Sequence, residues 1–213
     1  IFFWAGSFLA SFAQGVMLGC YITGFADGFG YLVFAALVGA AVCGGYVLLG
    51  AGWLVLKTEG ELQRKASGWT RWGLLWVALG VALVSLATPM VSQTVRDKWF
   101  DFPRTLTLMA LPLACIVAGM LAWRESGRIQ KRPGSREWLP FAASVAIFSL
   151  AFLGLAYSLF PYVVIDQMTI WEAAAHPSSL KVVLAGAAVV LPFIIAYTAI
   201  AYRVFRGKAR AGL

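Results

Sequence analysis

Long apolar stretches separated by short polar ones dominate the hydrophobic pattern of the chain. Six stretches are long enough to cross a bilayer, which takes about 20 helical residues. Their approximate limits are 1–25, 31–56, 72–95, 105–123, 138–164 and 182–203. They are continuously apolar rather than alternating, and backbone that faces lipid must form its hydrogen bonds internally, so helices are expected rather than strands. We therefore predict an all-α fold, a polytopic transmembrane bundle of about six spans that forms one integral membrane domain over residues 1–213.

The composition agrees with a chain that is surrounded by lipid. Hydrophobic residues make up 61% of the chain and charged residues only 12%, and the mean hydropathy is +0.82. Soluble domains carry roughly 25% charged residues, so a soluble protein with a large core is the weaker interpretation. The net charge of +8 indicates loops that face anionic membrane lipid, and no nucleic acid partner is expected. The cysteines lie inside apolar runs without a C-x-x-C pair, which predicts packing residues rather than a zinc site or disulfides.

Basic residues outside the spans lie mostly on one side of the predicted membrane. This side holds the connectors 57–71 and 124–137 and the C-terminal tail, with Lys57, Arg64, Lys65, Arg71, Arg124, Arg128, Lys131, Arg132, Arg136, Arg203, Arg206, Lys208 and Arg210. The other side holds only Arg96, Lys98, Arg104 and Lys181. The positive-inside rule therefore places the first group, and the C-terminus with it, in the cytoplasm.

Small residues recur at every fourth position of the first span, at Ser7, Ser11, Gly15 and Gly19. Such a ladder lies on one helix face and lets a neighbouring backbone approach closely. We interpret it as a helix-packing surface, within the chain or against a partner, with a ligand crevice as the alternative. Gln14 lies beside the ladder. A buried amide needs a hydrogen-bond partner, so Gln14 is predicted to bond across helices, with contact to a quinone or a lipid headgroup left open.

Side chains that could ligate haem or a metal are scarce. His176 is the only histidine, and it falls in the connector before the last span. Haem inside a helical bundle needs His, or His and Met, from facing helices, so this chain is predicted to hold no bis-His haem and no multi-His metal site by itself. No acidic residue falls at mid-span, which weakens the case for a transporter. No P-loop, metalloprotease or nucleophile-elbow motif occurs, and no catalytic residue is predicted.

The connector 166–181 contains a capping-box spacing, with Thr169 followed three residues later by Glu172. In such a box the threonine caps a helix N-terminus while the glutamate reaches back to its backbone. The spacing predicts a short helix at the membrane interface, with Trp171 as its anchor. A docking element for a partner is the alternative.

Four stretches together resemble one known family. They are GSFLASFAQGVMLGCYITGF (6–25), GAGWLVLKTEGELQRKA (50–66), FPYVVIDQMTIWEAAAHPSSLKVVL (160–184) and LPFIIAYTAIAYRVFRGK (191–208). In this order they are similar to subunit II of the cytochrome bd-type quinol oxidases, in particular the cyanide-insensitive branch. The similarity covers nearly the whole chain, although residues 72–137 match mainly in hydropathy and length. The family's subunit II opens with helices that carry a motif of the M-D-G-F-D type, so the resemblance implies that initial helices, expected to be three, are missing from this sequence.

The resemblance implies a role in aerobic electron transport in the bacterial cytoplasmic (inner) membrane. The family's complex oxidises quinol and reduces O2 to water, with protons drawn from the cytoplasm. Haem b, haem d and the quinol site belong to subunit I. The chain is therefore expected to be a non-catalytic, haem-free subunit that stabilises subunit I, with a bound structural quinone left open. A small-molecule membrane transporter subunit, and a structural or assembly protein without a redox partner, are the rival hypotheses.

A cluster of charges, KTEGELQRK (57–65), follows the second span. Lys57 can extend to the lipid headgroups, and Glu61 and Lys65 are spaced to pair if a helix continues beyond the bilayer. Glu59 and Glu61 lie on the side from which the family's protons are drawn, so they are candidates for proton collection. A hydrated helix end without such a role is the alternative.

Overall fold

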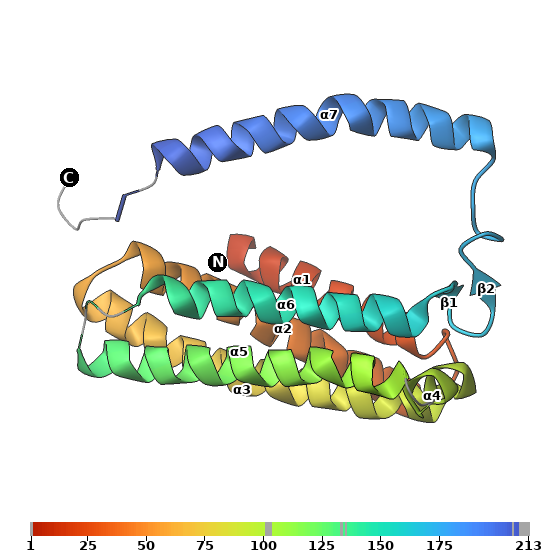
Figure 1. The fold of residues 1–213 in the computed structure, drawn as a ribbon, viewed down its shortest axis with the longest axis horizontal. Helices are drawn as coiled ribbons and strands as arrows, with labels where there is room; N and C mark the ends of the chain where they lie inside the picture. The colour runs from red at the N-terminus through yellow and green to blue at the C-terminus, as the bar shows by residue number, and fades with distance from the viewer. Residues whose placement is uncertain (1, 101–103, 133, 135, 206, 209–213) are drawn as a thin grey trace.

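Long helices run side by side along one axis and are joined by short connections at both ends (Figure 1). The computed structural model describes all residues except 1, 101–103, 133, 135, 206 and 209–213, and it describes the backbone but not the side chains of residues 104–107. In chain order the elements are α1 (Phe2–Ile22), α2 (Phe29–Lys57), α3 (Gly60–Val91), α4 (Gln93–Phe100), α5 (Arg104–Lys131), α6 (Trp138–Leu159), β1 (Tyr162–Val164), β2 (Met168–Thr169) and α7 (Pro177–Val204). Within the described residues, six helices are long and apolar enough to cross a membrane. The predicted all-α transmembrane class is confirmed.

The two ends of the bundle differ in chemistry. The basic end holds the α2–α3 and α5–α6 connections and the C-terminal end of α7 (Figure 1). The hairpin end holds the α1–α2 connection, α4 and the antiparallel β1–β2 pair. Two residues of the predicted basic tail, Arg206 and Arg210, lie outside the described residues.

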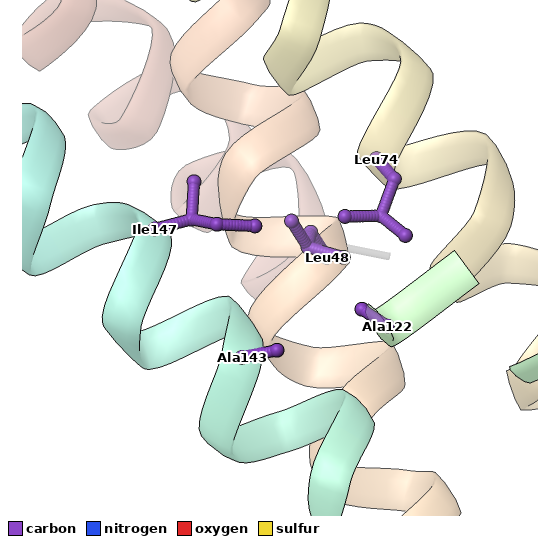
Figure 2. Close-up of a cluster of buried hydrophobic side chains, with 5 residues drawn as sticks. All are labelled: Leu48, Leu74, Ala122, Ala143 and Ile147. Carbon is purple, nitrogen blue, oxygen red and sulfur yellow. The ribbon is translucent and has the colours of Figure 1, made fainter. Parts of the chain in front are cut away.

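Apolar side chains from four helices fill the centre of the bundle. The central cluster comprises Leu48 of α2, Leu74 of α3, Ala122 of α5, and Ala143 and Ile147 of α6. Figure 2 shows these side chains pointing toward one another across the space between the helices. A second cluster, nearer the basic end, comprises Val55, Ala66 and Ile129. Small residues at both levels let the helices approach closely, which is how membrane helices gain packing energy in the absence of water.

Helix α7 is separated from the other helices over most of its length (Figure 1). None of its residues is buried by the described chain. Its described contacts lie near its C-terminal end, where Tyr202 packs edge-on against Trp53 at 5.6 Å between ring centroids and Lys57 Nζ donates to the carbonyl oxygen of Phe205 at 2.9 Å. The apolar surface of α7 must therefore be covered by lipid or by another protein surface.

The helices extend into stretches that the hydrophobic pattern predicts as connectors. Helix α3 begins at Gly60, so most of the predicted connector 57–71 is helical, and α5 continues to Lys131. Ion pairs within one helical turn accompany both extensions, Glu61–Lys65 at 3.0 Å and Glu125–Arg128 at 2.5 Å. Such pairs stabilise exposed helical turns. Hydropathy thus marks the edge of the membrane and not the end of the helix.

The structure corrects the limit of the fifth predicted span. That span was expected to reach residue 164, but α6 ends at Leu159 and Tyr162–Val164 forms strand β1. Pro161 lacks a backbone donor and disfavours a helical conformation at the residue before it, which favours the end of the helix at this point.

The predicted short helix after Thr169 is also wrong. The hydrogen bonds of the capping box do form, because the backbone N and the Oγ1 of Thr169 both donate to Glu172 Oε2, at 2.8 and 2.9 Å. A single turn follows, in which Ala173 N donates to Thr169 O at 3.0 Å. The chain then leaves the helical region at His176, which has φ −54° and ψ 142° before Pro177. Since a residue before proline avoids the helical conformation, the segment is too short for a helix.

Candidate functional site

Helices α1 and α2 approach each other closely at the glycine half of the small-residue ladder. A Cβ atom added to Gly15 would lie 2.6 Å from the Cα of Gly39, and one added to Gly19 would lie 2.5 Å from the Cα of Ala35. These distances are too short for any side chain, so α1 and α2 touch backbone to backbone here.

The serine half of the ladder has different surroundings. Ser7 is exposed, and Ser11 is half-buried with its Oγ donating to the carbonyl of Ser7 at 2.8 Å. Gln14 beside them is exposed, and its Oε1 accepts a hydrogen bond from the hydroxyl of Tyr46 on α2 at 2.9 Å. The structure therefore brings Gly15, Gly19 and Gln14 against α2 and leaves Ser7 outside this contact.

Charged side chains from distant parts of the chain meet at the basic end. Lys208, beyond α7, pairs with Glu137 before α6 at 2.5 Å and with Glu59 at 3.3 Å. Partial burial raises the pKa of Glu137, but hydrogen bonds from Lys208 and Gln63 outweigh it and leave that pKa below its usual value. The same hydrogen bond to Glu137 raises the pKa of Lys208. Both groups are thus held in their charged forms, and Lys208 fastens the segment after α7 to the start of α6 through Glu137 and to the α2–α3 connection through Glu59.

The two candidate proton-collecting residues occupy separate places at this end. The Glu59 side chain is 62% exposed and faces the tail through Lys208. The Glu61 side chain is 80% exposed on the outer surface of α3, where it pairs with Lys65. Both carboxylates are within reach of solvent, and they do not form one cluster.

A buried carboxylate that the sequence patterns did not single out lies on α5. Glu125 is only 5% exposed, and its Oε1 pairs with Arg128 at 2.5 Å. Its Oε2 has no hydrogen-bond partner among the described residues. Glu125 lines a cavity of about 440 Å³ together with Arg128, Gly134 and Arg136. Glu125 follows buried Ala122 by three residues, which on a helix brings the two side chains to the same face. This spacing predicts the burial of Glu125 only if the stretch 124–137 is recognised as partly helical.

The structure describes the surroundings of the potential haem and metal ligands, which are the histidine, the cysteines and the methionines. His176 is exposed at the N-terminus of α7, where its Nδ1 accepts from the backbone N of Ser178 at 3.4 Å. The Sγ atoms of Cys43 and Cys115 lie near backbone carbonyls, at 4.0 and 3.9 Å. The methionines Met17, Met90, Met109, Met120 and Met168 are all at least 43% exposed. Within the described ranges, His, Cys, Asp and Glu side chains form no group of three that could hold a metal ion.

Side-chain hydrogen bonds join the connections at the hairpin end to one another. Asp166 in the β1–β2 turn accepts hydrogen bonds from Ser92 and Thr94, at 2.7 Å each, at the junction between α3 and α4. Gln167 Nε2 donates to the carbonyl of Gly24 in the α1–α2 connection at 2.6 Å. The hairpin therefore ties the α1–α2 connection to the α3–α4 junction, which is a structural role.

Comparison with known proteins reveals a family that matches almost the whole chain. The family model described as cytochrome bd terminal oxidase subunit II matches residues 1–205. A search of curated proteins finds no match. The matched range includes every helix from α1 to α7, and it confirms the resemblance carried by the four stretches. The chain belongs to the cytochrome bd terminal oxidase subunit II family.

Proposed function

We propose that this chain is the haem-free subunit of a bd-type quinol oxidase and that it stabilises the haem-bearing subunit I by packing against it within the membrane. The family belongs to a haem-containing terminal oxidase complex with another subunit. The uncovered helix α7 is the observation that carries the proposal, because this helix is long and apolar enough to cross a membrane and none of its 28 residues is buried by the described chain. Subunit I is the partner that the family provides for such a surface.

The distribution of donor side chains supports the haem-free role. His176 lies at a helix end and already accepts a hydrogen bond, and the methionines lie on the outer surface. Haem b and haem d then belong to subunit I, and quinol and O2 are substrates of the complex, not of this chain alone. This subunit would keep water away from the haems by completing an apolar wall.

Purification of the native complex tests this proposal. We expect a bd-type haem spectrum and a larger, histidine-containing subunit that co-purifies with this chain. After the subunits are separated in mild denaturant, the haem should remain with the larger one. Haem that stays with this chain would contradict the haem-free role, and a monomeric chain that moves solute into vesicles would support the transporter instead.

Proton collection by Glu59 and Glu61 is a second, separable part of the proposal. The exposure of both carboxylates at the basic end supports it, provided that this end faces the cytoplasm. Replacing both residues with Gln should slow oxidase turnover without changing the amount of assembled complex. Normal turnover in a normally assembled complex would contradict it.

A further inference from the structure

A polar pair lies in the middle of two membrane-spanning helices. The hydroxyl of Tyr46 on α2 donates to Gln14 Oε1 on α1 at 2.9 Å, and both side chains are exposed on the surface of the described chain. Helix α1 has 21 residues, none of them charged, so it is only just long enough to cross a bilayer. At 1.5 Å per residue, Gln14 lies about 18 Å from one end of this helix and about 12 Å from the other. It is therefore placed in the apolar interior of the membrane.

The Gln14 amide keeps hydrogen-bond donors that lipid cannot satisfy. The bond from Tyr46 uses the amide oxygen and leaves both N–H groups of the nitrogen, and no described residue accepts a hydrogen bond from them. An amide that faces hydrocarbon without a partner is costly, because acyl chains contain no acceptor. The neighbouring Ser11 does not share this need, since its Oγ already donates to the carbonyl of Ser7 at 2.8 Å. The surface around Gln14 therefore requires a cover that contains a hydrogen-bond acceptor.

The residues around Gln14 on α1 favour a helix as this cover. Six positions, here called the Gln14 seam, follow one another at alternating intervals of four and three residues: Phe3, Ser7, Ala10, Gln14, Met17 and Tyr21. This is the 3.5-residue repeat along which two long helices pack. All of them except Tyr21 are exposed, and the small Ser7 and Ala10 allow a membrane helix to approach closely. Among the described elements α1 packs mainly against α2, which it meets on another face through Gly15 and Gly19.

We propose that the Gln14 seam binds a transmembrane helix of the haem-bearing subunit, and that this helix presents a hydrogen-bond acceptor to the Gln14 amide at mid-membrane. The inference rests on the proposed function, which supplies a partner in the membrane, and it assigns that partner a second contact surface in addition to α7. Tyr46 is a positioning residue in this contact, because its bond holds the amide oxygen and leaves the nitrogen for the partner. A quinone has acceptors in its ring, but a 3.5-residue repeat is the pattern of a helix partner rather than of a small ring.

Photo-crosslinking in the intact complex tests which molecule covers the seam. A small diazirine-bearing aliphatic amino acid in place of Ala10 should form a crosslink to a peptide of the haem-bearing subunit, identified by mass spectrometry. The matched control carries the same group in place of Leu9, which is 66% exposed and lies about 100° around the helix from Ala10. The control should crosslink to lipid. Equal crosslinking of both positions to the partner would overturn the proposal, and so would adducts of position 10 only with a quinone, with lipid or with a second copy of this chain.

Substitution of Gln14 tests the hydrogen bond itself. Gln14→Leu keeps the bulk of the side chain and removes the amide, so it should weaken the association between the subunits about threefold to tenfold, the size of a hydrogen bond between membrane helices. Dissociation of the purified complex on dilution in mild detergent, followed by native mass spectrometry, measures this ratio. Ser11→Ala is the matched control and should leave dissociation unchanged, because the hydroxyl that it removes bonds within α1.

Tyr46→Phe distinguishes a contact with the partner from a bond that only stabilises this chain. It removes the bond to Gln14 but leaves the amide available, so its effect on association should be smaller than that of Gln14→Leu. Equal losses of association in the two variants, or no loss in Gln14→Leu, would overturn the proposal. The proposed function fails separately, if the haem-bearing subunit does not co-purify with the wild-type chain at all.

Discussion

At the residue scale, the contact between α1 and α2 depends on two positions that have no side chain. A Cβ at position 19 would lie 2.5 Å from the Cα of Ala35, and backbone cannot move aside as a flexible side chain can. Gly19→Ala should therefore force the helices apart and lower the stability of the complex by about 1–3 kcal/mol, the usual cost of overpacking. The midpoint of thermal unfolding, followed by tryptophan fluorescence, measures this.

Gly6→Ala is the matched control for that change. Gly6 lies on the same helix, and a Cβ there would meet nothing within 4 Å. Alanine is a better helix former than glycine by about 1 kcal/mol, so Gly6→Ala should leave the midpoint unchanged or raise it. Equal midpoints for Gly19→Ala and Gly6→Ala would show that the close approach is not needed.

The ion pair between Glu137 and Lys208 should make the attachment of α7 depend on pH. Partial burial raises the pKa of Glu137, but the bonds from Lys208 and Gln63 bring it below its usual value. A carboxylate with a depressed folded-state pKa stabilises the fold above its unfolded-state pKa, and this contribution is lost as the pH falls through the folded-state pKa. Hydrogen exchange in the last turn of α7, corrected for intrinsic rates, should therefore stay slow near pH 7 and increase as the pH falls through the depressed pKa of Glu137, below the usual range of a glutamate.

Substitution of Glu137 tests whether its pair with Lys208 causes the pH dependence of hydrogen exchange in α7. Glu137→Gln should increase exchange at pH 7 and remove the acid transition, with a cost of about 1 kcal/mol or less for a partly exposed pair. Lys65→Gln breaks the Glu61–Lys65 pair, whose side chains are 80% and 61% exposed, and should leave exchange in α7 unchanged. If exchange in α7 still increases at low pH in Glu137→Gln, a group other than Glu137 causes the increase.

At the scale of elements, the β1–β2 hairpin holds the α3–α4 junction through a single side chain. Asp166 accepts hydrogen bonds from both Ser92 and Thr94 at 2.7 Å. Asp166→Ala should release the junction and cost about 1–3 kcal/mol for the lost charged bonds. Limited proteolysis should then cut residues 92–100 faster. Asp27→Ala, at an exposed aspartate of the same end, should not change the cleavage rate.

Asp166 also opposes the lowering of the pKa of its neighbour Lys98. Burial lowers the pKa of Lys98, and the charge of Asp166 raises it. Asp166→Ala should therefore lower the pKa of Lys98 further. An unchanged titration of Lys98 in this variant would mean that the two groups are screened from each other.

The membrane-spanning helices could be predicted from the sequence because a single physical property, continuous hydrophobicity, determines them. Continuous apolar runs identify the membrane-spanning helices, because backbone in lipid has few alternatives. The ends of the helices were less predictable. At the basic end, ion pairs such as Glu61–Lys65 extend α3 beyond its apolar part, and at the hairpin end Pro161 stops α6 before the apolar run is finished.

The candidate sites could be predicted only in part, because burial depends on which helix faces which. The spacing of the ladder indicates a shared face, but only the packing distinguishes Gly19 from exposed Ser7. Glu125 was missed because a charged residue next to Arg124 resembles any other charge at a helix end. Its burial follows from the position of α5 against the bundle, which no local pattern contains.

At the scale of the whole molecule, the apolar surface of α7 requires a cover that this chain does not supply, either lipid or a partner. Phe193, Ile195 and Tyr197 are each at least 66% exposed in the middle of this helix. The attachment at the basic end fixes one end of α7 and leaves its length available to a partner or to lipid. A membrane helix with an uncovered surface gains stability when it packs against a matching surface, and this is the contribution expected of α7 in the proposed complex.

The orientation of the molecule follows from its charges and can be measured directly. If the basic end faces the cytoplasm, as the positive-inside rule predicts, a cysteine there should be shielded from reagents outside intact cells. In a chain with Cys20, Cys43 and Cys115 replaced by Ser, Glu61→Cys should react with a membrane-impermeant maleimide only after permeabilisation. Ala174→Cys, at an exposed position of the hairpin end, should react in intact cells. The opposite pattern would place the basic end outside, and it would then remove Glu59 and Glu61 from any role in collecting cytoplasmic protons.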